Sequence, residues 1–375
     1  MIGKQNILIL GSRAPIALEM VRSFGQAGHH VVVADCQKLT VARWSKYTYK
    51  YFHIPSPAHH FNDFSERLSE IVVSEKIDHL IPTCEEAFYV SMCKDQFTCK
   101  VWVSRFDLMD DLHHKERFIS KAANFFYTPE TVSVEKIDDK FDWSNFIIKK
   151  KYSRFSNAIY LKPNERGIPV GVKDHSEWIA QEFIEGKEFC VYSIWDEGKL
   201  KSCSIYHPLH RIGSGSGIFF EPADIPELEQ QIQVFGEAIN FTGQLSFDFI
   251  FDGKEYIVIE CNPRGISGAH FIGKNLVHSF LETGKFEHET RADISIKPAI
   301  LLTQPNLLLK KKTIKSKDVL WRNNDFLPAL LQFLSLAELL YLSIKNKQSI
   351  IAASTYDIEW NGVMTVGVPI LKKHE

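Results

Sequence analysis

The segment 241–270 shows the clearest separation of apolar and polar positions in the chain. Two runs, 245–251 and 256–261, flank a turn-forming cluster at 252–255, which predicts the two strands of a hairpin. Side chains alternate between faces along a strand, so the odd positions form a wholly apolar face. The polar even positions are Asp248, Glu260 and Asn262.

These polar residues predict a metal site on the hairpin. If the turn holds an odd number of residues, Asp248 lies directly opposite Glu260, and facing carboxylates repel. A divalent cation bound between the two carboxylates would attract both and so remove this repulsion. Carboxylate and amide oxygens are ligands that Mg²⁺ or Mn²⁺ accepts. Arg264 follows closely and suits a phosphate or carboxylate. The alternative is a half-buried hairpin with a solvated polar face.

The N-terminal residues follow a strand, turn, helix, strand pattern over 6–10, 16–28 and 29–35, which predicts a βαβ unit. Gly11 stands where a tight strand-to-helix turn favours glycine, and Asp35 ends the second strand, as in dinucleotide-binding folds. The fingerprint G-x-G-x-x-G is absent. The pattern therefore predicts a Rossmann-like domain without its own dinucleotide and argues against an NAD-dependent oxidoreductase.

This α/β pattern continues to about residue 112. Thr83, Glu85 and Glu86 fall between a predicted strand and the helix that follows it, where the ligands of open α/β sheets gather. Together with Arg13 they are the candidate substrate contacts of this domain. The alternative for the two glutamates is a charge at a helix N-terminus, where it favours the macrodipole.

From residue 113 the pattern changes to α+β. A helix is expected from 113 to 126, a strand ending in the lysines 149–151, a helix near 175–181, and long strands at 188–195 and 201–207. The predicted fold class is therefore α/β and α+β, with three parts. They are an N-terminal domain 1–112, a second domain 113–290 and a C-terminal extension 291–375.

Composition narrows the classes of function. The 375 residues suffice for two or three domains. With 44 basic and 46 acidic residues the net charge is −2, which argues against general attraction to nucleic acid or to anionic membrane. The seven cysteines form no C-x-x-C pair, and the chain opens with a strand instead of a secretory signal, so a reduced, cytoplasmic protein is expected.

One stretch, 326–344, is long enough to span a bilayer but contains Pro328, Gln332 and Glu338. We therefore predict a core helix and no integral membrane span. The extension 291–375 is expected to pack on the second domain or to build an oligomer interface, which leaves a homo-oligomer open.

The order of these pieces resembles the ATP-grasp superfamily, in particular the branch with biotin carboxylase and carbamoyl-phosphate synthetase. The pieces are the βαβ opening, a helix starting with His-Lys, a strand ending in lysines, QEFIEGKE, and SFDFIF followed by VIECNPR. The resemblance spans roughly residues 5–275. It implies an ATP-grasp fold with a Rossmann-like N-terminal domain and a small mobile lid at roughly 130–183.

The resemblance also implies a nucleotide site for ATP. Lys115 and Lys149 would hold phosphates, with Lys150 and Lys151 as rivals of Lys149. The family's glycine-rich lid loop is replaced by a loop without glycine, in which small polar side chains would donate instead. Those side chains are Ser153, Ser156 and Asn157. Further along the chain, Glu182 and Ile184 belong to the linker whose backbone would bind the adenine edge, and Glu188 would accept from the ribose hydroxyls.

By the same resemblance Asp248, Glu260 and Asn262 are the ligands of Mg²⁺ or Mn²⁺. Arg264 and Arg211 would act on the transferring group. Ser267 and His270 begin a predicted helix whose free amides would receive the substrate's anion; the alternative is capping by Ser267.

The function implied is an ATP-dependent ligase. It would phosphorylate a small carboxylic acid to an acyl phosphate and join it to an amine or amino acid, releasing ADP and phosphate. The alternatives are a bicarbonate-activating carboxylase or carbamoyl-phosphate-type enzyme, and a catalytically silent ATP-binding scaffold.

Overall fold

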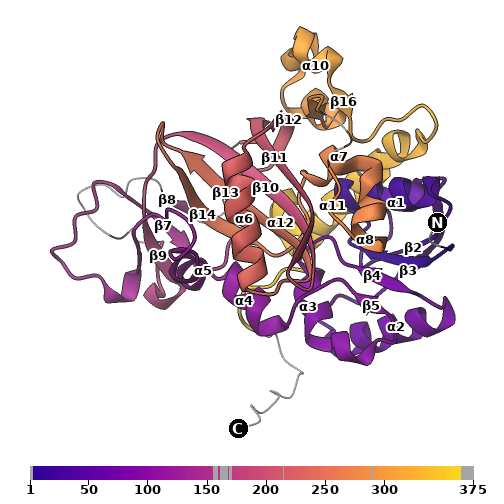
Figure 1. Ribbon diagram of the computed structural model, residues 1–375, viewed down its shortest axis with the longest axis horizontal. Helices are drawn as coiled ribbons and strands as arrows, with labels where there is room; N and C mark the ends of the chain where they lie inside the picture. The colour runs from indigo at the N-terminus through magenta and orange to yellow at the C-terminus, as the bar shows by residue number, and fades with distance from the viewer. Residues whose placement is uncertain are drawn as a thin grey trace. The chain divides into compact units, whose positions relative to one another are not determined.

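The computed structural model describes residues 3–154, 159–160, 168, 171–213, 215–287, 289 and 291–364. The chain forms two compact units. One comprises Met1–Phe106 together with Leu320–Glu375, and the other comprises Asp107–Val319. Figure 1 shows the elements of both units along the chain.

The first unit is built on a five-stranded parallel sheet in the order β3-β2-β1-β4-β5. This topology confirms the predicted Rossmann-like domain. Its strands are β1 Asn6–Leu10, β2 His30–Asp35, β3 Thr48–His53, β4 His79–Ile81 and β5 Lys100–Val101, and its N-terminal helices are α1 Pro15–Gln26, α2 Phe61–Ser74 and α3 Glu86–Cys93.

The turn between β1 and α1 requires glycine. Gly11 has φ +69°, and a Cβ there would lie 2.5 Å from Thr83 Oγ1. Pro15 then starts α1 at a position where the missing N–H costs no helical hydrogen bond. At the end of β2, Asp35 accepts from the Arg13 backbone N–H at 2.9 Å and pairs with its guanidinium. The carboxylate that dinucleotide folds offer to a ribose therefore holds an arginine in this protein.

The C-terminal residues belong to this first unit. Helix α11 Leu327–Asn346 and the short helix α12 Ile350–Ala353 follow a segment anchored on α1. The fully buried Arg22 donates to Asp325 Oδ2 at 2.8 Å and to the carbonyl of Leu320 at 2.8 Å. The segment that leads into α11 is therefore held within the first unit, and packing of the helix at 326–344 on the second domain stays a prediction.

A further segment, 354–360, lies at the carboxyl ends of the parallel strands. Arg13 donates to the carbonyl of Ser354 at 2.9 Å and pairs with Asp357 at 2.5 Å. The backbone N–H of Trp360 donates to Glu85 at 3.0 Å, and the carbonyl of Glu359 accepts from Tyr89. The chain's own C-terminal segment thus contacts the edge at which ligands of such sheets gather.

We expect Asp325→Ala to destabilise the first unit strongly, because it leaves the buried Arg22 charge without its carboxylate. Ser45 and the backbone of Lys46 also donate to Asp325 and would lose their acceptor. The cost is about 3 kcal/mol, or roughly 6–12 °C in Tm for a unit of this size. Thermal unfolding followed by circular dichroism measures it, with the exposed Asp95→Ala as control. Equal Tm values for the two variants would refute this role.

Helix α11 is not a core helix, so that prediction is wrong. Only 6% of its most apolar 18-residue stretch is buried, although the helix is long and apolar enough to cross a membrane by length and composition. One reason is that its few inward contacts are partly polar: Glu338 accepts from the backbone N–H groups of Lys38 and Leu39 at 2.9 and 2.6 Å. The prediction that the chain has no integral membrane span stays a prediction.

The second unit contains two sheets. A seven-stranded sheet has the order β14-β13-β10-β11-β12-β15-β16, and a four-stranded sheet has the order β6-β9-β7-β8. All neighbouring strands are antiparallel except β15 and β16. The strands are β6 Thr131–Ser133, β7 Phe146–Lys150, β8 Ile159–Tyr160, β9 Trp178–Glu182, β10 Lys187–Asp196, β11 Lys199–Arg211, β12 Gly217–Ala223, β13 Gly243–Phe251, β14 Tyr256–Asn262, β15 Ile294–Ser295 and β16 Lys317–Asp318.

The helices of this unit bury an aromatic core against the larger sheet. They are α4 Phe106–His113, α5 Lys115–Ala122, α6 Pro226–Ala238, α7 Ala269–Ile272, α8 Leu276–Leu281, α9 Lys297–Thr303 and α10 Lys311–Lys315. Phe118 of α5 and Phe235 of α6 pack on Phe247 of β13. This core confirms the apolar odd face predicted for the first strand of the hairpin. On the second strand the core contains Val258 and Cys261. The apolar core positions predicted at Ile257 and Ile259 are therefore wrong, because the register shifts between them and Cys261.

The helix expected near 175–181 is absent. A single 3₁₀ turn at His175–Glu177 leads directly into β9. The reason is burial: Trp178, Ile179 and Ala180 are all buried inside the four-stranded sheet, between β6 and β7. A short continuous apolar run cannot be assigned to helix or strand by periodicity alone.

Candidate functional site

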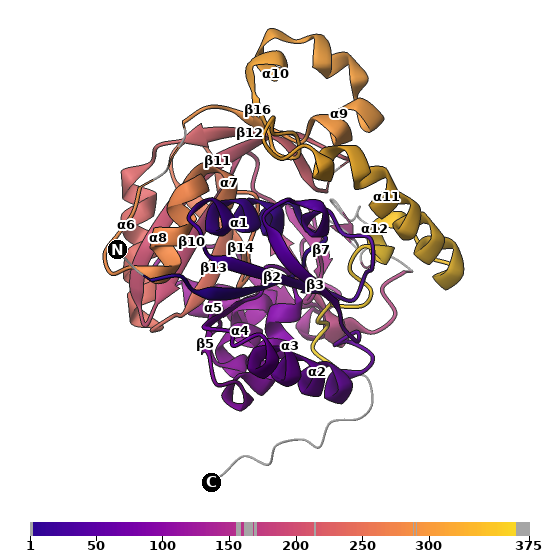
Figure 2. The ribbon, with the colours of Figure 1, turned by 90° about the vertical axis from the view of Figure 1, so that its right-hand side faces the viewer.

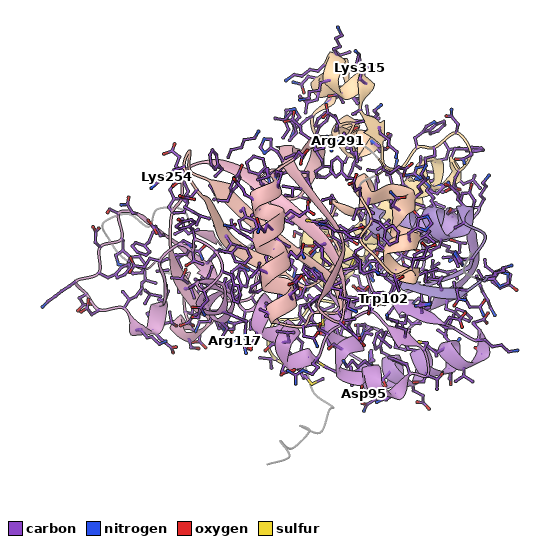
Figure 3. The ribbon with its side chains drawn as sticks, viewed as in Figure 1. Asp95, Trp102, Arg117, Lys254, Arg291 and Lys315 are labelled. Atoms are coloured by element: carbon purple, nitrogen blue, oxygen red, sulfur yellow. The ribbon has the colours of Figure 1, made fainter. Side chains whose placement is uncertain are left out.

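The hairpin β13–β14 sets Asp248 opposite Glu260, as the sequence predicted, but by a different route. The turn holds four residues, 252–255, because Phe251 pairs with Tyr256. An even turn alone would leave the two carboxylates out of register. A bulge between Phe249 and Asp248 on the ladder skips Ile259 and restores the pairing. Figure 3 labels Lys254, which lies in the turn of this hairpin.

The bulge also creates a contact for a lysine. Lys149, on β7, donates from Nζ to the carbonyl of Ile259 at 3.3 Å. Lys115, the first residue of α5, lies with Nζ 3.4 Å from a carboxylate oxygen of Glu260. Both lysines are buried, 3% exposed each. Two ammonium groups therefore stand beside the carboxylate pair.

The two neighbouring lysines make other contacts: Lys150 faces away because successive residues of β7 point to opposite faces, and Lys151 follows the end of this strand. Lys150 pairs with Glu177 at 2.8 Å and is exposed enough to lie over the Trp178 ring. Lys151 pairs with Glu116 at 3.2 Å. Of the three rivals that the sequence left open, Lys149 is the one beside the hairpin.

The charges of this group shift one another's pKa. Burial raises the pKa of Asp248 well above its usual range, and the neighbouring Glu260 and Glu188 add to the rise. Burial acts on Glu260 in the same direction, but attraction by Lys115 and Lys149 outweighs it and lowers its pKa. Burial lowers the pKa of Lys149 to about 8. Asp248 is thus the carboxylate whose charged form is disfavoured by its surroundings.

Asn262 and Arg264 extend the site beyond the end of β14. Asn262 Nδ2 donates to Glu260 at 3.3 Å, and Arg264 Nη2 donates to Asn262 Oδ1 at 3.3 Å. The carbonyl of Arg264 accepts from Ser246 Oγ at 2.7 Å. The oxygens of Asp248, Glu260 and Asn262 form a hard-oxygen donor set, and two facing carboxylates with an amide oxygen beside them are ligands that a divalent cation accepts.

A group on β10 that sequence reasoning did not assemble adjoins Asp248. Ligand atoms of Glu188, Cys190 and Asp248 lie within 4.8 Å of one another. Cys190 pairs directly with Asp248 across β10 and β13, and because these strands are far apart in the sequence no local pattern signals the contact. Arg211, at the end of β11, forms an ion pair with Glu188 and donates to the carbonyl of Gly215. The two sequence candidates Glu188 and Arg211 are therefore partners.

The remaining nucleotide candidates lie where the two sheets connect. β9 ends at Glu182 and β10 begins at Lys187, so Ile184 belongs to the connection between the four-stranded and the seven-stranded sheet. Glu182 accepts from the backbone N–H of Glu130 at 3.1 Å. The carbonyl of Ser153 accepts from Lys115 at 3.1 Å, whereas Ser156 and Asn157 lie outside the described residues.

Two of the amides expected to be free at the helix after β14 are not free. The N–H groups of Ala269 and His270 donate to the carbonyls of Ile266 and Ser267, at 3.3 and 3.1 Å. The alternative, capping by the Ser267 side chain, is wrong, because the N-cap is Gly268 and has no side-chain hydrogen bond. Tight turns at 266–271 use these amides within the backbone. A substrate role for the side chains of Ser267 and His270 stays a prediction.

The substrate candidates of the first unit have partners within that unit. Thr83 Oγ1 donates to the carbonyl of Leu10 at 2.8 Å. Glu86 accepts from the backbone N–H groups of Thr83 and Cys84 at 2.9 and 3.0 Å, so it satisfies amides at the start of α3. With Arg13 and Glu85 bound to the C-terminal segment, the substrate role of all four stays a prediction.

We expect the affinity for Mg-ATP to fall above pH 8 because of Lys149. A depressed pKa means that the free protein holds this ammonium only below about pH 8, whereas bound phosphate favours the charged form. At pH 9 binding should take up nearly one proton and be about 10-fold weaker than at pH 7. Titration calorimetry in two buffers of different ionisation enthalpy measures the uptake. Lys149→Met should abolish it, and uptake that persists in this variant would assign it to another group.

Comparisons with known proteins agree with this geometry. An ATP-grasp domain model matches residues 112–268. The multifunctional protein pyr1-3 of Dictyostelium discoideum is 28% identical over 118 residues, which is 29% of this chain and 5% of that protein. Residues 112–268 are therefore similar to an ATP-grasp domain, and this matched stretch includes both lysines and the whole β13–β14 hairpin.

Solved structures share the fold at low sequence identity. The N5-carboxyaminoimidazole synthetase of Staphylococcus aureus, solved with ADP, has a TM-score of 0.64 at 16% identity and covers 81% of this chain and 86% of its own. A second structure is the biotin carboxylase domain of the Hydrogenobacter thermophilus 2-oxoglutarate carboxylase, solved with MgADP and bicarbonate. It has a TM-score of 0.60 at 12% sequence identity, and the match covers 77% of this chain and 72% of that chain. The L-amino acid ligase of Bacillus licheniformis has a TM-score of 0.56 at 15% sequence identity, and the match covers 73% of this chain and 71% of that protein. At these sequence identities the similarity shows a shared fold.

Proposed function

We propose that the chain is an ATP-dependent ligase that activates a small carboxylic acid as an acyl phosphate and joins it to an amine or amino acid. ATP and Mg²⁺ or Mn²⁺ would be required. The observation that carries the proposal is the group on the β13–β14 hairpin: Asp248 opposite Glu260, Asn262 beside them, and Lys115 and Lys149 within reach of the same carboxylates.

Each residue has a role that its surroundings support. Asp248, Glu260 and Asn262 would hold the metal, which neutralises phosphate charge that otherwise repels an incoming carboxylate. Lys115 and Lys149 would hold phosphate oxygens, since both are cations fixed by packing. Arg264 would orient the transferring phosphoryl group as a bidentate donor.

The carboxylate oxygen of the acid would attack the γ-phosphorus, and ADP would leave. The amine nitrogen would then attack the acyl carbon of the acyl phosphate, and inorganic phosphate would leave as the C–N bond forms. Arg211, half-buried beside Glu188 and close to Asp248, would stabilise the charge on the departing inorganic phosphate. We propose that the four-stranded sheet β6-β9-β7-β8 acts as a lid and excludes water from the site.

The experiment is phosphate release from Mg-ATP across a matrix of carboxylic acids, amino acids, amines and bicarbonate, with Glu260→Gln as the inactive control. Release that requires one acid and one amine supports the ligase. The acid is then labelled with ¹⁸O in its carboxylate, and acyl phosphate chemistry predicts one ¹⁸O in the released phosphate. Release without label transfer would contradict the acyl phosphate route.

A second candidate is bicarbonate activation. It is favoured by the similarity in fold to a biotin carboxylase domain that was solved with bicarbonate. This candidate predicts phosphate release with bicarbonate alone in the same matrix. If ATP binds and nothing in the matrix causes turnover, a nucleotide-binding scaffold takes the place of both enzymes.

A further inference from the structure

Helix α11 carries a continuous apolar stripe on its exposed side. Its large side chains are between 42% and 70% exposed, and Figure 2 shows the helix with α12 beside it. The stripe consists of Phe326, Leu327, Leu330, Phe333, Leu336, Leu340, Tyr341 and Ile344. In soluble proteins an exposed apolar patch of this kind marks an interaction surface.

The spacing of the stripe is that of a helix-pairing seam. Positions 326, 330, 333, 337, 340 and 344 are separated by four and three residues in strict alternation, which is the a and d pattern of a coiled coil. Ala337 occupies one of these positions, and a small residue there allows close approach. Leu327 and Tyr341, one residue after a d position, widen the seam.

The area of the stripe is sufficient for a stable interface. An aromatic side chain has roughly 150–250 Å² in all and a leucine or isoleucine somewhat less, so eight side chains that are about half exposed present on the order of 600–800 Å². A standard interface buries about 800 Å² on each partner. Ile350 and Ile351 of α12 are also 49% and 43% exposed and can add to it.

The charges along α11 favour a protein partner over a lipid surface. Helices that lie on anionic membranes are rich in lysine and arginine on the polar face. Within α11 the charged residues are Glu338 and Lys345, and Glu338 is held by the backbone N–H groups of Lys38 and Leu39. The stripe itself carries no charge, so two identical stripes can face each other without repulsion.

We propose that α11 pairs with α11 of a second copy of this chain, and that the protein is a homodimer through this stripe. A two-fold axis makes the same patch serve both partners. This inference does not depend on the proposed function, because no residue of the nucleotide site takes part.

The test is the mass of the full-length protein by sedimentation equilibrium between 0.5 and 50 μM. The wild type is expected to be a dimer, and Phe333→Glu combined with Leu340→Glu is expected to weaken self-association at least about 100-fold. The matched control is Tyr49→Glu combined with Val73→Glu, which charges side chains that are 64% and 67% exposed elsewhere on the same unit. The control should remain dimeric.

Circular dichroism and ATP binding check that each variant is folded. If the glutamate variant misfolds, Phe333→Ser combined with Leu340→Ser replaces it, with the same expected loss of dimer. A monomeric wild type across the range would overturn the proposal, as would a dimer that the α11 variants leave intact. Flotation of a monomer with vesicles of phosphatidylcholine and phosphatidylglycerol, lost in the α11 variant, would assign the stripe to a membrane instead.

Discussion

Asp248→Asn and Glu260→Gln are two single variants that we expect to abolish Mg²⁺-dependent ATP turnover to the same extent. Their effects on the free energy of unfolding should have opposite signs. Each substitution removes one carboxylate of the facing pair, so turnover should fall by at least about 10³-fold in both. In the protein without nucleotide or metal, Glu260→Gln should unfold at lower temperature than the wild type. Asp248→Asn should unfold at the same temperature or higher.

The reason lies in the cations. Glu260 lies beside Lys115 and Lys149, both buried, so its loss leaves two ammonium groups without a carboxylate and costs about 2–4 kcal/mol. The raised pKa of Asp248 means that ionising it opposes folding at neutral pH. That penalty is absent below the unfolded pKa of a carboxyl group and grows as the pH rises toward the folded value. The gain from Asp248→Asn should therefore be larger at pH 7 than at pH 4.

Thermal unfolding by calorimetry, with and without Mg-ATP, measures both effects. Wild-type protein should gain stability from Mg-ATP, and neither variant should. Glu255→Gln, on the same hairpin but in its turn, is the control and should behave as wild type. Equal Tm values for the two active-pair variants would contradict the assignment of the lysines to Glu260.

Lys149→Met is expected to weaken Mg-ATP binding on the order of 100-fold, because a buried cation positioned for phosphate is lost. Its neighbour Lys150→Met removes the same charge one residue further along β7. That side chain points to the opposite face and forms an exposed pair with Glu177, so its loss should change binding by less than about 2-fold.

Fluorescence titration with a labelled ATP analogue measures both affinities under one set of conditions. The pair of variants keeps composition and net charge identical, so a difference between them reports position alone. Equal weakening by both would mean that a general positive potential, and not a placed ammonium, attracts the nucleotide. Stronger weakening by Lys150→Met would reverse the assignment along β7.

The functional hairpin could be predicted because its information is local. Strand parity separates Asp248 and Glu260 from the apolar face without reference to any distant residue. The pairing of the two carboxylates was correct, yet the expected odd turn was wrong, because a bulge at Ile259 compensates for a turn of four residues. A bulge depends on packing against both strands and leaves no mark in the alternation of the sequence.

The features that sequence did not predict depend on contacts between distant residues. The ion pair of Glu188 with Arg211 joins two strands, and Asp325 reaches Arg22 across 303 positions. The topology of the fold brings such pairs together, and the periodicity of apolar residues along the sequence carries no information about it. Helix α11 was assigned to a core because apolar residues are usually buried, whereas its apolar side is the exposed one.

The measurement that tests the central claim most directly is the binding of Mn²⁺ in the presence of a non-hydrolysable ATP analogue, followed by electron paramagnetic resonance of the free ion. If the β13–β14 hairpin holds the metal, the wild type and Glu255→Gln should both bind Mn²⁺ tightly. Asp248→Asn and Glu260→Gln should each weaken it by at least about 10-fold. Wild-type affinity in either of these two variants would show that the facing carboxylates do not hold the metal.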